Sequence, residues 1–183
     1  MIRRMLFQLT ANLPCRLIDL DGEPYLERYY LFSFRKVTFY LHRFVSSDSE
    51  RHLHNHPWGW GSALVLAGSY LEEKAVDICP QASESGCVTE MRVVRWCNSV
   101  NGNKLHRIHK AKPNTWTLFI HGPRVVLSDG EFKGWGFVKR ISDRGKDASL
   151  FFPFPTHDTK WWTCAPKGMD SGRLPADYYL YGD

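Results

Sequence analysis

Three histidines at alternate positions, His52, His54 and His56, are the residues best suited to chemistry in this 183-residue chain. In an extended strand, residues two apart share one face, so these imidazoles can lie side by side. Neutral imidazole is a common metal ligand, and two of them supply half of a four-coordinate site. Pro57 favours extended backbone at His56, which supports a strand in this segment. The spacing therefore predicts a metal site.

A third ligand must come from elsewhere in the chain, and His106 is the best candidate. It follows Asn101-Gly102, and Asn-Gly is the strongest short-range signal for a hairpin turn. The turn would return the chain so that His106 lies on a strand facing His54 and His56. His52 stays open as a replacement for either of its neighbours.

A carboxylate could complete the ligand set, and Glu72 is the preferred candidate. It shares one face of the next predicted strand with Tyr70. The alternative, that Glu72 is a solvated surface charge, stays equally open. His42 could donate a hydrogen bond that orients a ligand, although a histidine of the core or surface is the simpler interpretation.

The elements that must position these residues are strands. Short apolar runs, most regular at residues 36–45, recur about 8–12 residues apart with turn signals between them. This pattern predicts an all-β antiparallel barrel or sandwich, with residues 1–143 as one domain, and it includes a short strand at residues 6–9. Residues 144–183 are rich in proline and paired aromatics, and we expect an irregular arm that packs on the barrel.

Composition narrows the classes of protein. Apolar residues make up 43% and charged residues 23%, as in globular domains, and the net charge of +5 is not gathered into a basic run, so nucleic acid is not an expected partner. The five cysteines are odd in number and form no C-x-x-C pair, which favours free thiols in a reducing compartment. No signal peptide or membrane span is recognisable, and we expect a cytoplasmic protein.

The histidine pattern resembles the two motifs of the cupin superfamily. His54 and His56 match the His-x-His pair of the first motif, Gly68 matches its closing glycine, and His106 matches the histidine of the second motif. Gly61 stands where the family's glutamate ligand would be. The resemblance covers residues 36–140 and implies a double-stranded β-helix, or jelly roll, with a metal inside the barrel.

A narrower resemblance is to bacterial and phage cupin-like proteins that have no assigned reaction. The shared segments are Leu53-His54-Asn55-His56-Pro57-Trp58, Gly68-Ser69-Tyr70-Leu71-Glu72, His106-Arg107-Ile108, Thr117-Leu118, Gly122-Pro123-Arg124 and Trp135-Gly136-Phe137. This similarity implies the fold and the metal site only.

The resemblance implies a divalent metal, with Fe(II) favoured and Mn, Ni or Zn as alternatives. We expect an iron(II) oxygenase or hydroxylase that acts on a small polar molecule. The alternatives are an isomerase, hydrolase or lyase without oxygen chemistry, and a non-catalytic ligand-binding module. Cupin-like barrels often form homodimers. The residues expected to line the pocket or to act on the substrate are Trp58, Trp60, Tyr70, Trp135, Arg107 and Arg124.

Overall fold

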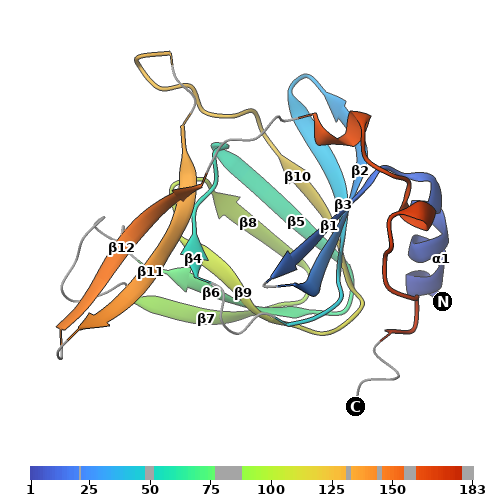
Figure 1. Cartoon of the computed structure of the whole chain (residues 1–183), viewed down its shortest axis with the longest axis horizontal. Coiled ribbons are helices and arrows are strands. Elements are labelled where there is room, and N and C mark those ends of the chain that lie inside the picture. The colour runs from blue at the N-terminus through green and yellow to red at the C-terminus, as the bar shows by residue number, and fades with distance from the viewer. Residues whose placement is uncertain are drawn as a thin grey trace.

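Two antiparallel six-stranded sheets face each other in the computed structural model of the protein (Figure 1). The structure describes residues 1–20, 22–47, 52–76, 88–130, 133–143, 146–154 and 160–178. The helices are α1 (Ile2–Leu9) and the 3-10 turns η1 (Thr10–Asn12), η2 (Trp161–Thr163) and η3 (Gly168–Asp170). The strands are β1 (Cys15–Leu20), β2 (Glu23–Phe34), β3 (Val37–Phe44), β4 (Leu53–His54), β5 (Trp60–Ala67), β6 (Tyr70–Ala75), β7 (Thr89–Val94), β8 (Cys97–Asn101), β9 (His106–Ala111), β10 (Thr115–His121), β11 (Trp135–Asp143) and β12 (Lys146–Phe154).

The strand order is that of a jelly roll. The first sheet runs β1-β2-β3-β10-β5-β8 and the second runs β12-β11-β4-β9-β6-β7. The eight strands from β3 to β10 cross from one sheet to the other at every step except the β6–β7 hairpin, as in a jelly roll, with β1 and β2 added to one sheet and β11 and β12 to the other. The predicted all-β antiparallel fold class is confirmed.

The core lies between the sheets because the inward-facing residues of each strand are apolar. In β5, Ala63 and Val65 are buried while Leu64 between them is half exposed, the period-2 pattern of a strand with one face in the core. Val65 belongs to a core cluster of buried residues that come from both sheets: Tyr25, Leu26, Phe44, Val65, Tyr70, Val94 and Ala111.

The prediction of a strand at residues 6–9 is wrong, because this segment lies in α1. Leu6 and Thr10, one helical turn apart, are both buried, and Leu6 packs on the outer face of the first sheet against Tyr29 and Trp116. A four-residue apolar run fits either a strand or a helix, and the contact with the sheet decides between them.

The C-terminal region contains more regular structure than expected. Residues 146–154 form β12, which pairs with β11 along its whole length and extends the second sheet (Figure 1). Residues 160–178 carry two 3-10 turns and no strand, and they run back beside α1, where Pro14 bridges Lys167. None of the described helices is long and apolar enough to cross a membrane.

A buried arginine fastens this C-terminal segment to the barrel. Arg43 is fully buried and donates hydrogen bonds to both carboxylate oxygens of Glu27 and to Asn114 Oδ1. Its Nη atoms also donate to the carbonyl oxygens of Leu174 (2.7 Å) and Pro175 (2.5 Å). Glu27 in turn accepts a hydrogen bond from the Leu174 amide. The guanidinium therefore joins β2, β3 and the segment after η3.

Candidate metal centre

His54, His56 and His106 converge at one wall of the barrel interior. His54 ends β4, and the register places it directly opposite His106 at the start of β9. The chain then leaves the strand, and His56 lies in the following loop. The three residues are therefore brought together by one strand pairing and one loop.

The Asn-Gly turn between β8 and β9 holds that loop in place. Gly102 donates its N–H to the Gly59 carbonyl (3.1 Å) and accepts the N–H of His56 (3.3 Å). A Cβ on Gly102 would lie 1.7 Å from the carbonyl oxygen of Trp58, so no other residue fits without moving the backbone. Only glycine lets the backbone at position 102 come this close to the backbone of residues 56–59. This contact fixes the position of His56 relative to His106.

The donor atoms of the three imidazoles all lie within 4.8 Å of one another. The Nε2 atoms of His56 and His106 are 2.7 Å apart, and each pair of ring centroids is separated by 5.0 Å. Two nitrogens each about 2.1 Å from one metal, at right angles, would lie about 3 Å apart. The positions of these rings fit a shared ion.

The protonation states of the rings support the same conclusion. Burial, together with the nearby His106 and His54, lowers the pKa of His56 well below 6.5, so this ring is neutral at pH 7. His106 Nδ1 lies 2.8 Å from Glu72 Oε1, which fixes the proton on Nδ1 and leaves a lone pair on Nε2. Such a lone pair 2.7 Å from another nitrogen needs a proton or a cation between them.

Glu72 lies behind His106, on the side of the ring away from His56. Its Oε1 also accepts a hydrogen bond from Asn98 Nδ2 at 2.8 Å, and its side chain is 1% exposed. Burial acts to raise the pKa of Glu72, but the hydrogen bonds that it accepts from His106 and Asn98 outweigh burial and hold the pKa below its usual range. The carboxylate is therefore ionised and orients the imidazole.

The second oxygen, Glu72 Oε2, has no hydrogen-bond partner in the described structure and lies 3.8 Å from Arg92 Nη2. One carboxylate oxygen of Glu72 is therefore buried near the histidines and accepts no hydrogen bond from the described residues. From the sequence, Glu72 could be either a metal ligand or a solvated surface charge. In the structure it is buried, and its carboxylate binds Nδ1 of His106, the ring nitrogen away from His56.

At Gly61, where the cupin motif has its glutamate, an aromatic ring takes the space. A Cβ added to Gly61 would lie 3.2 Å from the Phe119 ring. A carboxylate there would have to displace Phe119, which packs on His42 and Trp58. The candidate centre is therefore a set of three imidazoles without a carboxylate from β5.

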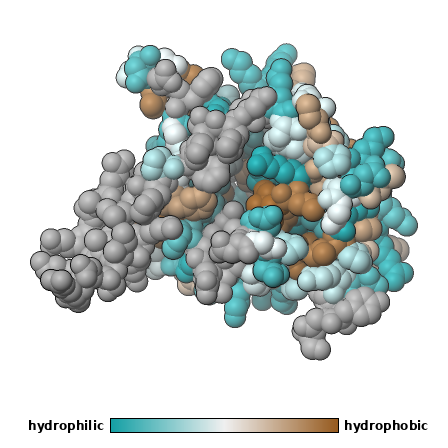
Figure 2. All heavy atoms as spheres, in the orientation of Figure 1, coloured by the Kyte–Doolittle hydropathy of each residue, from teal (hydrophilic) through white to brown (hydrophobic). Residues whose placement is uncertain are grey.

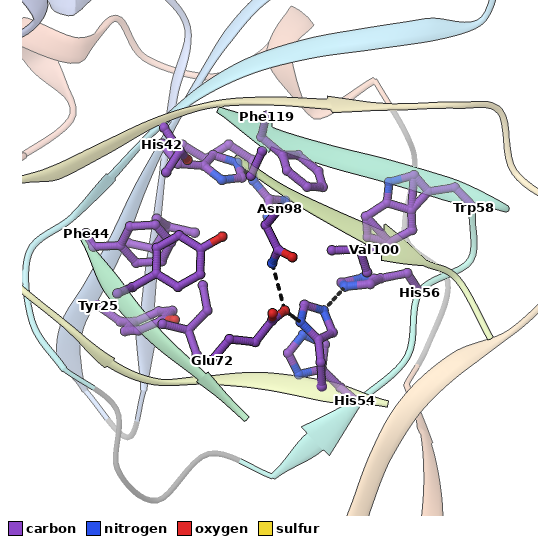
Figure 3. A pocket seen from close by; sticks show the side chains of 17 residues that line it. Tyr25, His42, Phe44, His54, His56, Trp58, Glu72, Asn98, Val100 and Phe119 are labelled. Carbon is purple, nitrogen blue, oxygen red and sulfur yellow. Dashed lines mark hydrogen bonds and ion pairs between the residues drawn. The ribbon is translucent and has the colours of Figure 1, made fainter. Parts of the chain in front are cut away.

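A cavity of about 100 Å³ opens beside the histidines. Figure 3 shows Tyr25, Phe44, Phe119 and Val100 as its apolar walls, with His54, His56 and Glu72 grouped at one side. Both sheets contribute lining residues, so the cavity lies between them. Figure 2 shows apolar atoms gathered near the centre of this face of the molecule, bordered by polar ones. Apolar walls with a few polar groups are typical of small-molecule sites.

The aromatic residues predicted for the pocket divide into two groups. Trp58 and Tyr70 line the cavity, and Trp58 packs edge-on against His56 with ring centroids 3.7 Å apart. Trp60 points out of the barrel, is 47% exposed and lies over Gly122, because it alternates with the inward-facing Gly61. Trp135 lies beyond the cavity lining and contacts Phe137, which in turn contacts His54.

The two arginines predicted to hold substrate, Arg107 and Arg124, do not line the cavity. Arg107 alternates with the inward-facing His106, so its Nε binds Glu73 on the other face of the sheet. Arg124 forms a backbone bridge with Trp58. His52 lies outside the converging group, and its carbonyl oxygen is 3.4 Å from His54 Nδ1.

Sequence reasoning missed Arg28 and Asn98 and gave His42 only a minor role. All three line the cavity, and Arg28 Nε donates to His42 Nε2 at 3.1 Å. Burial, with the charge of Arg28, lowers the pKa of His42 well below 6.5. The sequence did contain a signal for Arg28. It lies two residues after Leu26 in the apolar segment 25–34, so in a strand both side chains share one face.

His42 and His56 should make the stability of the fold sensitive to acid. The pKa of His42 and His56 is lowered in the folded state, so the unfolded chain binds their protons first, and stability falls as the pH drops below about 6.5. Each such histidine costs up to about 1.4 kcal/mol per pH unit. Urea unfolding of metal-free protein at pH 7 and pH 5 measures this, and His42→Gln should reduce the difference. Equal stability at both values would contradict it.

Glu72 should tune metal affinity through His106. Glu72→Gln keeps an oxygen for His106 Nδ1 but removes the charge, so metal should still bind, about 10- to 100-fold more weakly. Titration with a coloured metal indicator measures the affinity. Glu73→Gln is the matched control, because Glu73 pairs with Arg107 outside the cavity. Complete loss of metal in Glu72→Gln would instead identify Glu72 as a fourth ligand.

Comparison with known proteins gives structural neighbours only. No family model matches the chain, and no curated protein is detectably similar in sequence. Fe(II) HppE superposes with a TM-score of 0.43 at 10% identity, over 60% of this chain and 56% of that one. The overlap thus spans little more than half the length of that protein.

Two further neighbours show the same low similarity. KdgF from Halomonas sp. has a TM-score of 0.42 at 15% identity, over 60% of this chain and 94% of its own. A cupin superfamily protein from Desulfitobacterium hafniense has a TM-score of 0.39 at 17% identity, over 58% and 84% of the two chains. At this level of similarity the neighbours assign neither a reaction nor a substrate.

Proposed function

We propose that this chain is a metal-dependent enzyme, and that it is an iron(II) oxygenase or hydroxylase acting on a small polar molecule. The observation that supports this most is the convergence of His54, His56 and His106 at the wall of a cavity. Imidazole donors suit iron, nickel, copper and zinc, whereas an all-oxygen set would suit magnesium or calcium.

The number of protein ligands separates a working site from a structural one. Structural zinc sites are closed by four protein ligands, whereas three ligands leave positions for water, dioxygen or substrate. His54, His56 and His106 are all lining residues, so those remaining positions would face the cavity. A divalent metal held there would supply Lewis-acid chemistry, and iron would add dioxygen chemistry.

The chain's own residues would prepare the reaction. Glu72 holds the His106 proton on Nδ1 and keeps Nε2 available as a donor atom. Trp58 packs against His56 and fixes the angle of that ring. The apolar walls exclude water, which strengthens every electrostatic interaction within the cavity. These contacts position the site before a substrate arrives.

Metal analysis followed by oxygen uptake tests the proposal. Protein purified without a polyhistidine tag should contain close to one divalent metal per chain, and Fe(II)-loaded protein should consume oxygen when a panel of small hydroxy acids, thiols and phosphonates is supplied. His54→Ala, prepared in the same way, is the background. Oxygen uptake no greater than that of His54→Ala across the panel would contradict the oxygenase assignment.

Two other results would select the alternatives. Conversion of a panel compound without oxygen, dependent on bound metal, would indicate an isomerase, hydrolase or lyase. If the tag-free protein instead contains no metal and fails to bind added Fe(II), Mn(II), Ni(II) or Zn(II), that result would indicate a non-catalytic ligand-binding module.

A further inference from the structure

The helix α1 covers only part of the outer face of the first sheet. Its Leu6 packs against Tyr29 and Trp116, which are both fully buried. Elsewhere on the same face, large apolar side chains are about half exposed. They are Phe32 and Phe34 on β2, and Trp60 and Leu64 on β5. Part of this face is therefore apolar and uncovered, and an extended apolar surface of this kind usually marks a contact with another molecule.

The strand register joins these side chains into one surface. Phe32 pairs with Phe39, and their rings stack with centroids 4.4 Å apart. Phe39 pairs in turn with Ile120 on β10, and in the next row Leu118 pairs with Leu64. Because paired residues point to the same side of a sheet, the two rows form a continuous apolar surface. The outer patch is the set Phe32, Phe34, Phe39, Trp60, Leu64 and Ile120.

The outer patch carries no charged side chain. In the whole of β3, β5, β8 and β10, Arg43 is the only lysine, arginine, aspartate or glutamate, and it is buried against Glu27. Arg35 and Lys36, in the turn between β2 and β3, lie at the rim. The centre of a protein–protein interface is typically poor in charge and rich in aromatic residues. An uncharged surface can also meet a second copy of itself without bringing like charges together.

The size of the outer patch determines how strongly it could associate. Its residues lie on four strands about 4.8 Å apart and in rows about 6.8 Å apart, which gives a footprint of about 400 Å². A standard stable interface buries about 800 Å² on each partner. A contact through the outer patch is therefore at the small end of specific interfaces, and such contacts are reversible.

We propose that the outer patch is the interface of a reversible homodimer, in which the patches of two copies of this chain pack face to face. Two sheets packed in this way lie about 10 Å apart, and their side chains interdigitate. Each copy presents the same residues, so the pair closes and leaves no free patch for a third copy. The proposal is independent of the proposed function, because the three histidines line the cavity between the sheets.

Sedimentation velocity tests the proposal on the wild-type protein. Over about 1 to 200 µM it should show a monomer–dimer equilibrium with a dissociation constant on the order of 10 µM. Phe32→Glu and Leu64→Glu each place a carboxylate in the outer patch, and each should weaken the dimer by about 10-fold or more, because the charge must lose water on association. Val93→Glu is the matched control, because Val93 is similarly exposed but lies on β7 of the second sheet.

Thermal unfolding shows whether each variant is folded, and either patch variant decides if the other is not. Wild type that stays monomeric over the whole concentration range overturns the proposal. A dimer that persists in the folded patch variants, or that only Val93→Glu removes, overturns it as well, because the contact then lies elsewhere. Co-sedimentation with phosphatidylglycerol vesicles tests the other occupant. Monomeric wild type that binds these vesicles would assign the outer patch, with Arg35 and Lys36 at its rim, to a membrane surface instead.

Discussion

Replacing His54, His56 or His106 with alanine should each remove most of the bound metal. The three donor atoms lie within 4.8 Å of one another, so in the proposed centre every ring would contribute one bond to the same ion. Loss of a residue that only orients a ligand costs about 10- to 100-fold in affinity, and loss of the ligand itself should cost more than that. Metal content after dialysis, measured by mass spectrometry on protein without a polyhistidine tag, provides the readout.

His109→Ala is the matched control for these variants. His109 lies on β9 with His106, but it is not one of the converging residues and does not line the cavity. It should therefore keep the metal content of the wild type. Circular dichroism of all four variants shows that the β structure is retained. Metal content close to wild type in any of the three ligand variants would contradict a three-histidine centre.

Arg43→Met should destabilise the fold strongly. Arg43 is fully buried and binds Glu27, Asn114 and the carbonyl oxygens of two C-terminal residues. Methionine fills part of the volume but leaves the Glu27 carboxylate buried without its countercharge. Removing one partner of a buried ion pair costs about 3–5 kcal/mol, which is a large share of the stability of a domain. Urea unfolding monitored by tryptophan fluorescence measures this loss.

A second ion pair and a double variant test whether the loss of stability comes from the unpaired charge of Glu27. Arg107 binds Glu73 in a more exposed pair, so Arg107→Met should cost no more than about 1 kcal/mol. Arg43→Met combined with Glu27→Leu removes both buried charges, and the double variant should be more stable than Arg43→Met alone. If the double variant is instead the less stable of the two, the cost comes from lost packing rather than from an unpaired charge.

The sequence by itself predicted the all-β class, most of the strands and the three histidines of the candidate centre. Alternation of apolar residues is a local property of an extended chain, so it predicts an all-β fold without knowledge of the strand partners. His54 and His56 were recognisable because two residues bring the chain back to nearly the same side, and the Asn101-Gly102 turn pointed to His106. These signals depend on spacing within a few residues, which is what a sequence records directly.

Only the tertiary structure decided what surrounds the histidines. Arg28 and Asn98 come from strands far apart in the chain, and nothing within their own segments shows which residues they face. Glu72 Oε1 reaches His106 Nδ1 because β6 pairs with β9 in one register, and a shift by one residue would turn its side chain to the other face. The same dependence on pairing explains α1 and β12, whose residues fit more than one local structure until a neighbouring sheet selects one.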